Sequence, residues 1–263
     1  MLQLPPFTPG ETIQFANSTT VHNASHGGSA LDSGSSISFA IEVLQVDKGR
    51  ARLRWILLDG AAWGPESSPG LTRWFKSLRG APIEIVTDAS GLPLDVANWS
   101  AISEEAAPET AEAAAAYPPL TRADLTSLMK RSFLTNGLTS DLVTMAAMQI
   151  RTPTLMGHTD LKSDQRPNLS IARTVDVKDP DPTTCAVSIS RSTVQTFSFG
   201  GKPHPAMKLE TSSVVSTADG WVISLHEVRE QPNFIKTTDI RRLTPAPCPS
   251  IPASPVSPTP RGQ

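Results

Sequence analysis

Alternation of apolar and polar residues is the dominant pattern of this chain, and it predicts β-strands. Residues 37–43 and 51–57 each place an apolar side chain at every second position, and the turn Asp47-Lys48-Gly49 separates them. Successive side chains of a strand point to opposite faces of a sheet, so these segments predict a hairpin with one apolar face. Ile56 and Leu58 make the far end apolar on both faces, which predicts that another element covers it.

The same alternation predicts further strands and hairpins. They are a first strand over 11–23, a hairpin around the turn 88–91, hairpins around the turns 179–182 and 219–220, and a last strand over 234–243. The Gly/Ser-rich stretch 26–36 predicts a flexible loop. Each β stretch follows the layout hairpin, crossing, hairpin, so an internal duplication is a hypothesis.

Helical periodicity is confined to the middle of the chain. Leu71, Trp74, Phe75 and Leu78 recur with spacings of three and four, which predicts a short helix with one apolar stripe. A capping pattern at the start of 121–149 and an internal Asn-Gly predict a helical hairpin there. The Ala/Glu-rich stretch before it fits either a helix or a loose linker.

These elements together predict an α+β protein, mainly antiparallel, in which a helical hairpin joins two curved-sheet halves. The predicted organisation is an N-terminal β half over 1–99 with the short helix 71–78 as a lid, a helical connector over 100–150, a C-terminal β half over 151–243, and a disordered Pro-rich tail over 244–263.

Composition narrows the class of protein. Hydrophobic residues make up 38% of the chain and charged residues 18%, the balance of a folded chain rather than a disordered one. The net charge of −2 predicts no nucleic-acid partner, because nucleic-acid-binding domains are normally basic. No apolar run approaches the roughly 20 residues of a membrane span, so we expect a soluble protein without a transmembrane segment.

The N-terminus and the cysteines bear on localisation. The first residues lack the basic and apolar regions of a signal peptide. We therefore expect a periplasmic or secreted protein if a leader was removed, and a cytoplasmic one otherwise. Cys185 and Cys248 could form one bridge that tethers the C-terminal tail, whereas in a reducing compartment both would be thiols.

The sequence lacks the common motifs for catalysis, metal binding and cofactor binding. The chain has no G-x-S-x-G, Walker A or G-x-G-x-x-G motif, and His226-Glu227 lacks the second histidine of a zinc protease. His22 and His26 precede Asp32, and His158 precedes two aspartates, but the surrounding residues favour exposed loops over metal sites. We therefore predict no catalytic residue, no metal and no cofactor, and we lean towards a non-enzymatic protein.

Aromatic residues gather in the first half of the chain and are the candidate ligand site. They could line an apolar cavity beneath the short helix, or they could simply form the core of this half. The candidate ligand-binding residues are Trp55, Trp63, Leu71, Trp74, Phe75, Leu78 and Trp99.

Turn motifs give the chain a resemblance to uncharacterised bacterial cell-envelope proteins. The pattern is a short helix, a strand, D-x-x-G-x-P as in Asp88–Pro93, and an ending Asn98-Trp99. The later Asp219-Gly220-Trp221 hairpin resembles the second half of such proteins. The resemblance covers about half the chain and implies export. A curved sheet packed on helices also resembles the carriers that ferry lipoproteins across the periplasm, as a fold analogy.

Three functions are compatible with this sequence. The first is a non-enzymatic envelope-associated protein that binds an apolar ligand such as a lipid, or the surface of a partner protein in the envelope. The second is a hydrolase or metal-dependent enzyme that uses His22, His26 or His158 with nearby acids. The third is a structural or interaction module in which the Pro-rich tail acts as a tether.

Overall fold

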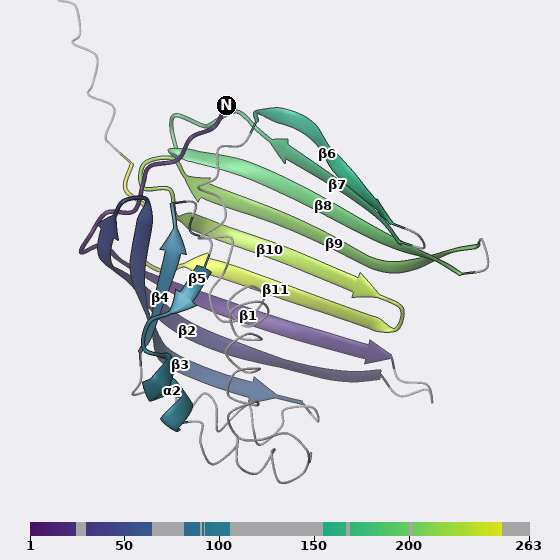
Figure 1. Cartoon of the computed structure of the whole chain (residues 1–263), viewed down its shortest axis with the longest axis horizontal. Coiled ribbons are helices and arrows are strands. Elements are labelled where there is room, and N and C mark those ends of the chain that lie inside the picture. The colour runs from purple at the N-terminus through teal and green to yellow at the C-terminus, as the bar shows by residue number, and fades with distance from the viewer. Residues whose placement is uncertain are drawn as a thin grey trace, which may run out of the picture.

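One large antiparallel β-sheet dominates the molecule (Figure 1). The computed structural model describes residues 1–24, 30–64, 82–89, 91, 93–105, 155–166, 169–199 and 202–248. The strands are β1 (Thr12–Ala24), β2 (Ala30–Asp47), β3 (Arg50–Trp63), β4 (Ile83–Asp88), β5 (Pro93–Val96), β6 (Gly157–Arg166), β7 (Leu169–Val177), β8 (Ala186–Phe199), β9 (Lys202–Ser216), β10 (Val222–Gln231) and β11 (Phe234–Arg242).

The eleven strands lie in the order β5-β4-β3-β2-β1-β11-β10-β9-β8-β7-β6. Each half of the chain is therefore a sequential meander, and the two meanders meet where β1 pairs with β11. That central ladder runs from the pair Phe15–Arg242 to the pair Asn23–Phe234. As a result β5 and β6 lie at opposite edges of the sheet, as Figure 1 shows.

The predicted α+β class, with two curved-sheet halves joined by a helical hairpin, is wrong. The halves are parts of one continuous sheet, and the described residues contain a single seven-residue helix, α2 (Trp99–Glu105). Two separate sheets would leave the backbone groups of β1 and β11 unpaired along one side, and the shared ladder satisfies them. The predicted helix 71–78 and helical hairpin 121–149 lie outside the described residues.

The predicted hairpins are confirmed, and the regions between them account for the errors. Lys48 and Gly49 both have positive φ, 45° and 76°, as a two-residue hairpin turn between β2 and β3 requires. Residues 30–36 were predicted as loop, but they form the first part of β2. The strand β6 was not predicted at all, because its sequence is polar and lacks apolar alternation.

The hydrophobic core lies against one end of one sheet face, which we call the inner face. Its fully buried side chains include Phe15, Phe39 and Trp55 from the central and N-terminal strands. The N-terminal segment closes this end, where Phe7 packs edge-on against Trp221 with ring centroids 5.3 Å apart. The opposite face is the outer face, and the opposite end of the strands, at the β10–β11 turn, is the distal end.

The two cysteines form the disulfide that their sequence positions allowed. Cys185 and Cys248, with Cα atoms 5.5 Å apart, join the β7–β8 connection to the segment after β11. Residues 249–263 of the predicted tail lie outside the described residues. Within the part of the chain that the structure describes, no helix is long and apolar enough to cross a membrane.

Candidate ligand-binding groove

The aromatic residues proposed from the sequence lie in different surroundings. Trp55 is fully buried, and its ring centroid lies 5.7 Å from that of Phe39. Trp99 is half-buried against the same core, whereas Trp63 is 41% exposed at the end of β3. The other four, Leu71, Trp74, Phe75 and Leu78, lie outside the described residues. A ligand site beneath the short helix therefore stays a prediction.

A groove of about 620 Å³ lies at the distal end of the sheet, around the tip of the β10–β11 hairpin. β9 continues beyond this tip, because its pairing with β10 ends at Lys208 while the strand begins at Lys202 (Figure 1). The step in the sheet leaves room around the tip. The groove is lined by His22, Ala24, Val194, Gln195, Met207, Lys208, Glu230, Gln231, Pro232, Asn233, Phe234 and Ile235.

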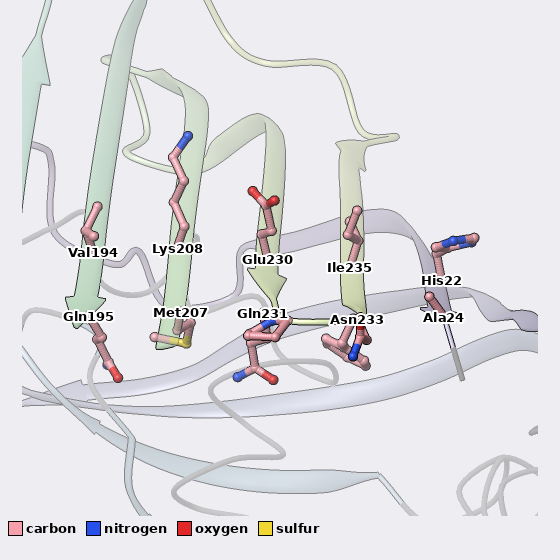
Figure 2. Close-up of a pocket in the computed structure, with 12 residues that line it drawn as sticks. His22, Ala24, Val194, Gln195, Met207, Lys208, Glu230, Gln231, Asn233 and Ile235 are labelled. Atoms are coloured by element: carbon pink, nitrogen blue, oxygen red, sulfur yellow. The ribbon is translucent and has the colours of Figure 1, made fainter. Parts of the chain in front are cut away.

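Side chains from both faces of the sheet line this groove. Figure 2 shows Val194, Lys208, Glu230 and Ile235 in an upper row of side chains, with Met207 below them. The register explains the division, because Lys208 pairs with both Val194 and Glu230, and directly paired residues share a face. The groove therefore wraps around the hairpin tip rather than lying on a single face.

The walls of the groove are mainly apolar. Val194 and Ile235 are each 40% exposed on the outer side, while Met207 and Phe234 are half-buried on the inner side. Full burial of an apolar side chain of this size stabilises by roughly 1.5–3 kcal/mol relative to full exposure, so the partial exposure of these side chains forgoes part of that gain. An apolar molecule in the groove would bury them.

The positive charge on the outer rim is already matched. Lys208 donates to Glu210 at 2.9 Å, and this hydrogen bond, followed by the charges of Glu210 and Glu230, raises the pKa of Lys208. The outer rim therefore presents an ion pair to the groove, with the carboxylate of Glu230 nearby.

Behind the groove, charged side chains occupy the inner face. We call them the polar band: Arg173, Arg191, Glu227, Arg229 and Lys236. Arg229 and Lys236 form a directly opposed pair. Each lies two residues from the groove residues Gln231 and Phe234, towards the core end of the sheet. The band carries four cations and one acid, so it is strongly cationic although the whole chain has a net charge of −2.

Two arginines of the band lack acidic partners among the described residues. Burial lowers the pKa of Arg191, because desolvation disfavours its charged form. The Nε atom of Arg229 is buried and has no hydrogen-bond acceptor in the described part of the chain. Arg173, Glu227 and Lys236 take part in interactions of their own.

The histidines considered for hydrolysis are paired with aspartates but do not converge. His22 of β1 contacts Asp32 of β2 at 2.6 Å, so this pair lies on strands rather than in the predicted loop. His158 of β6 lies 3.5 Å from Asp160, and five strands separate β6 from β1. His26 lies outside the described residues. Among the residues described, no group of three potential metal ligands occurs.

Sequence reasoning missed the groove, although two positions signalled it. Val194 follows Ser188, Ser190 and Ser192 on the outer face of β8, so an apolar residue stands where the alternation requires a polar one. Ile235 likewise occupies an outer-face position of β11. The step that places these residues together depends on strand lengths, which the alternation does not specify.

Comparisons with known proteins show no family. No protein-family model matches this chain, and neither does any curated protein. A structure of lipovitellin, titled for its lipid–protein interactions, is 11% identical with a TM-score of 0.35, and the match covers 90% of this chain but 25% of lipovitellin. This chain therefore spans only about a quarter of the length of lipovitellin.

Two bacterial structures are more distant. A LolA superfamily protein from Nitrosomonas europaea is 7% identical with a TM-score of 0.16, and the match covers 92% of this chain and 90% of that one. A protein of unknown function with a hot dog fold from Alicyclobacillus acidocaldarius is 11% identical with a TM-score of 0.12, covering 93% and 81%. With TM-scores this low, these structures carry no functional argument.

Proposed function

We propose that this chain is a non-enzymatic binding protein that holds an apolar ligand in the groove at the tip of the β10–β11 hairpin. The observation that supports the proposal is the volume of about 620 Å³ together with its apolar walls. Ligand pockets typically enclose about 300–1,000 Å³ and are mostly apolar with a few polar groups. The groove has both properties.

The predicted site beneath the helix 71–78 and the groove differ in how accessible their apolar side chains are to a ligand. Trp55 of the predicted site is fully buried against Phe39, so no ligand can reach it without displacing core side chains. Val194 and Ile235 of the groove are accessible as they stand. A small apolar ligand therefore has a direct route to the groove, and the proposal is made for that site.

Binding of the neutral fluorescent probe N-phenyl-1-naphthylamine tests this function. We expect the wild-type protein to enhance probe fluorescence with a saturable titration curve, and Ile235→Ser to weaken binding by about tenfold, since it removes roughly 1.5 kcal/mol of apolar burial. The matched control is Leu58→Ser on β3, because Leu58 is similarly exposed, at 45%, but does not line the groove. Its titration should match the wild type.

Two results would contradict the proposal. In the first, the wild-type protein shows no saturable uptake of the probe. In the second, Ile235→Ser and Leu58→Ser have equal effects, which would show that the probe senses exposed apolar surface in general.

A further inference from the structure

We infer that the ligand of the groove is an amphiphile with an anionic group, which Arg191 and Arg229 of the polar band bind on the inner face. This inference rests on the proposed function, because the apolar part of the same molecule would occupy the groove. It adds the chemical class of the ligand and the residues that recognise its charge.

The register places the cations directly behind the groove. Residues two apart along a strand share a face and lie about 7 Å apart, so Arg229 follows Gln231 at that distance into the inner face. Arg191 is one step deeper and two strands away, because it pairs with Thr211, and Thr211 pairs with Glu227. A ligand lying along the inner face from the groove therefore meets Arg229 first and Arg191 next.

The described residues supply neither an acidic partner for Arg191 nor an acceptor for the Nε of Arg229. A buried cation without a paired anion is costly, and removing the partner of a buried pair is among the most destabilising changes in proteins. Arg191 is half-buried, and desolvation lowers its pKa, while Arg229, also half-buried, has a buried Nε without an acceptor among the described residues. A carboxylate or phosphate oxygen would supply the missing acceptor, and arginine suits both geometrically.

Neighbouring charges also favour an anion over a cation or a neutral head. Lys236 stands opposite Arg229, and Arg173 lies on the same face of β7. Glu227 is the one acid among the five side chains of the polar band. The outer rim differs, because Lys208 is already paired with Glu210 there. Because the inner face carries the cations, the anionic head group of a ligand should bind on the inner face. Its apolar chain would then lie in the groove at the edge of the sheet.

Comparison of cis-parinaric acid with its methyl ester tests the inference. The two fluorescent probes share the same chain, and only the acid is charged. We expect the wild-type protein to bind the acid at least about tenfold more tightly, since hydrogen bonds to charged groups contribute about 1.5–3 kcal/mol. In Arg191→Gln and Arg229→Gln the affinity for the acid should fall to within a few-fold of that for the ester. Arg241→Gln, an exposed outer-face arginine, is the matched control and should retain the preference.

The outcomes separate this inference from the proposed function. Equal wild-type affinities for acid and ester would overturn the anionic ligand and leave the groove intact as an apolar site. A preference that survives both arginine substitutions would overturn the assignment to Arg191 and Arg229. Failure of both probes and of N-phenyl-1-naphthylamine would instead overturn the proposed function. If a substitution prevented folding, loss of neutral-probe binding would reveal it, and the wild-type comparison would still decide.

Discussion

Two arginines of the inner face, Arg242 and Arg191, differ in their burial and in their partners. At the core end, Arg242 is almost completely buried and donates to Asp219 at 2.7 Å and to the carbonyl of Pro245 at 3.2 Å. Asp219 also accepts a hydrogen bond from the backbone of Trp221 at 3.1 Å. Nearer the groove, in the middle of β8, the half-buried Arg191 has no such carboxylate among the described residues. The first arrangement fits a structural role, and the second fits a site for an external anion.

Removing the carboxylate at the core end should be strongly destabilising. We expect Asp219→Ala to lower the free energy of unfolding by about 3–5 kcal/mol, because it leaves Arg242 buried and unpaired. The matched control is Asp239→Ala, whose carboxylate pairs with His226 at 2.7 Å but is 59% exposed, and it should cost less than about 1 kcal/mol. Urea denaturation measures both. Equal small losses would show that the buried pair does not stabilise the fold.

At the scale of elements, three strands of the N-terminal half are joined across their outer face. Arg54 of β3 contacts Glu42 of β2 at 3.1 Å and Glu84 of β4 at 3.2 Å, and Arg52 also pairs with Glu84. Arg52 and Arg54 stand at alternate positions of β3 and therefore share one face. The carboxylates that match them come from neighbouring strands, which only the register reveals.

This network should make stability depend on pH in the acidic range. Burial opposes ionisation of Glu84, but hydrogen bonds and charges from Arg52 and Arg54 outweigh it and hold the pKa of Glu84 below its ordinary 4.5. A lowered native pKa stabilises the fold above the unfolded-state value, and that contribution is lost as pH falls through the native value. We therefore expect Glu84→Gln to be less stable than the wild type at pH 7, with the difference shrinking below about pH 4.5.

Unfolding by urea at pH 7 and at several values below pH 4.5 measures this difference. A gap between wild type and Glu84→Gln that stays constant over the whole series would contradict an ionic role for Glu84. A gap that grows in acid would reverse the sign of the argument, since it would mean that protonated Glu84 is the more stabilising form.

The sequence predicted elements where local pattern and fold agree. The β2–β3 hairpin has apolar alternation and a turn with residues suited to positive φ, and it forms as expected. Residues 30–36 are rich in Ser and Gly and have poor strand propensity, yet β1 pairs with all of them and β3 with residues 34–36, which holds them in the sheet. The groove was not predicted either, because it arises from the unequal lengths of paired strands and not from a local sequence pattern.

At the scale of the whole molecule, the ladder between β1 and β11 joins the two halves of the chain into one sheet. It is the junction of two meanders that are otherwise sequential, and the chain passes between them only by linking β5 and β6 at opposite edges. Local alternation predicted hairpins within each meander but not this long-range pairing, because the alternation in β1 and β11 would be the same if neither strand had a partner on that side. The inner face is continuous across the junction, from Phe39 through Phe15 to Arg242.

If this ladder organises the molecule, the covalent link between β5 and β6 should be dispensable for association. We expect fragments 1–105 and 155–263, expressed together, to copurify as a one-to-one complex, because the pairs from Phe15–Arg242 to Asn23–Phe234 bury apolar side chains and satisfy both edges. A second fragment that ends at Gln231, and so lacks β11, is the control and should not copurify. Size-exclusion chromatography of the tagged first fragment measures both. Failure of the intact pair to associate, or equal recovery of the truncated one, would show that the ladder contributes little and that the linking segment is needed to hold the halves together.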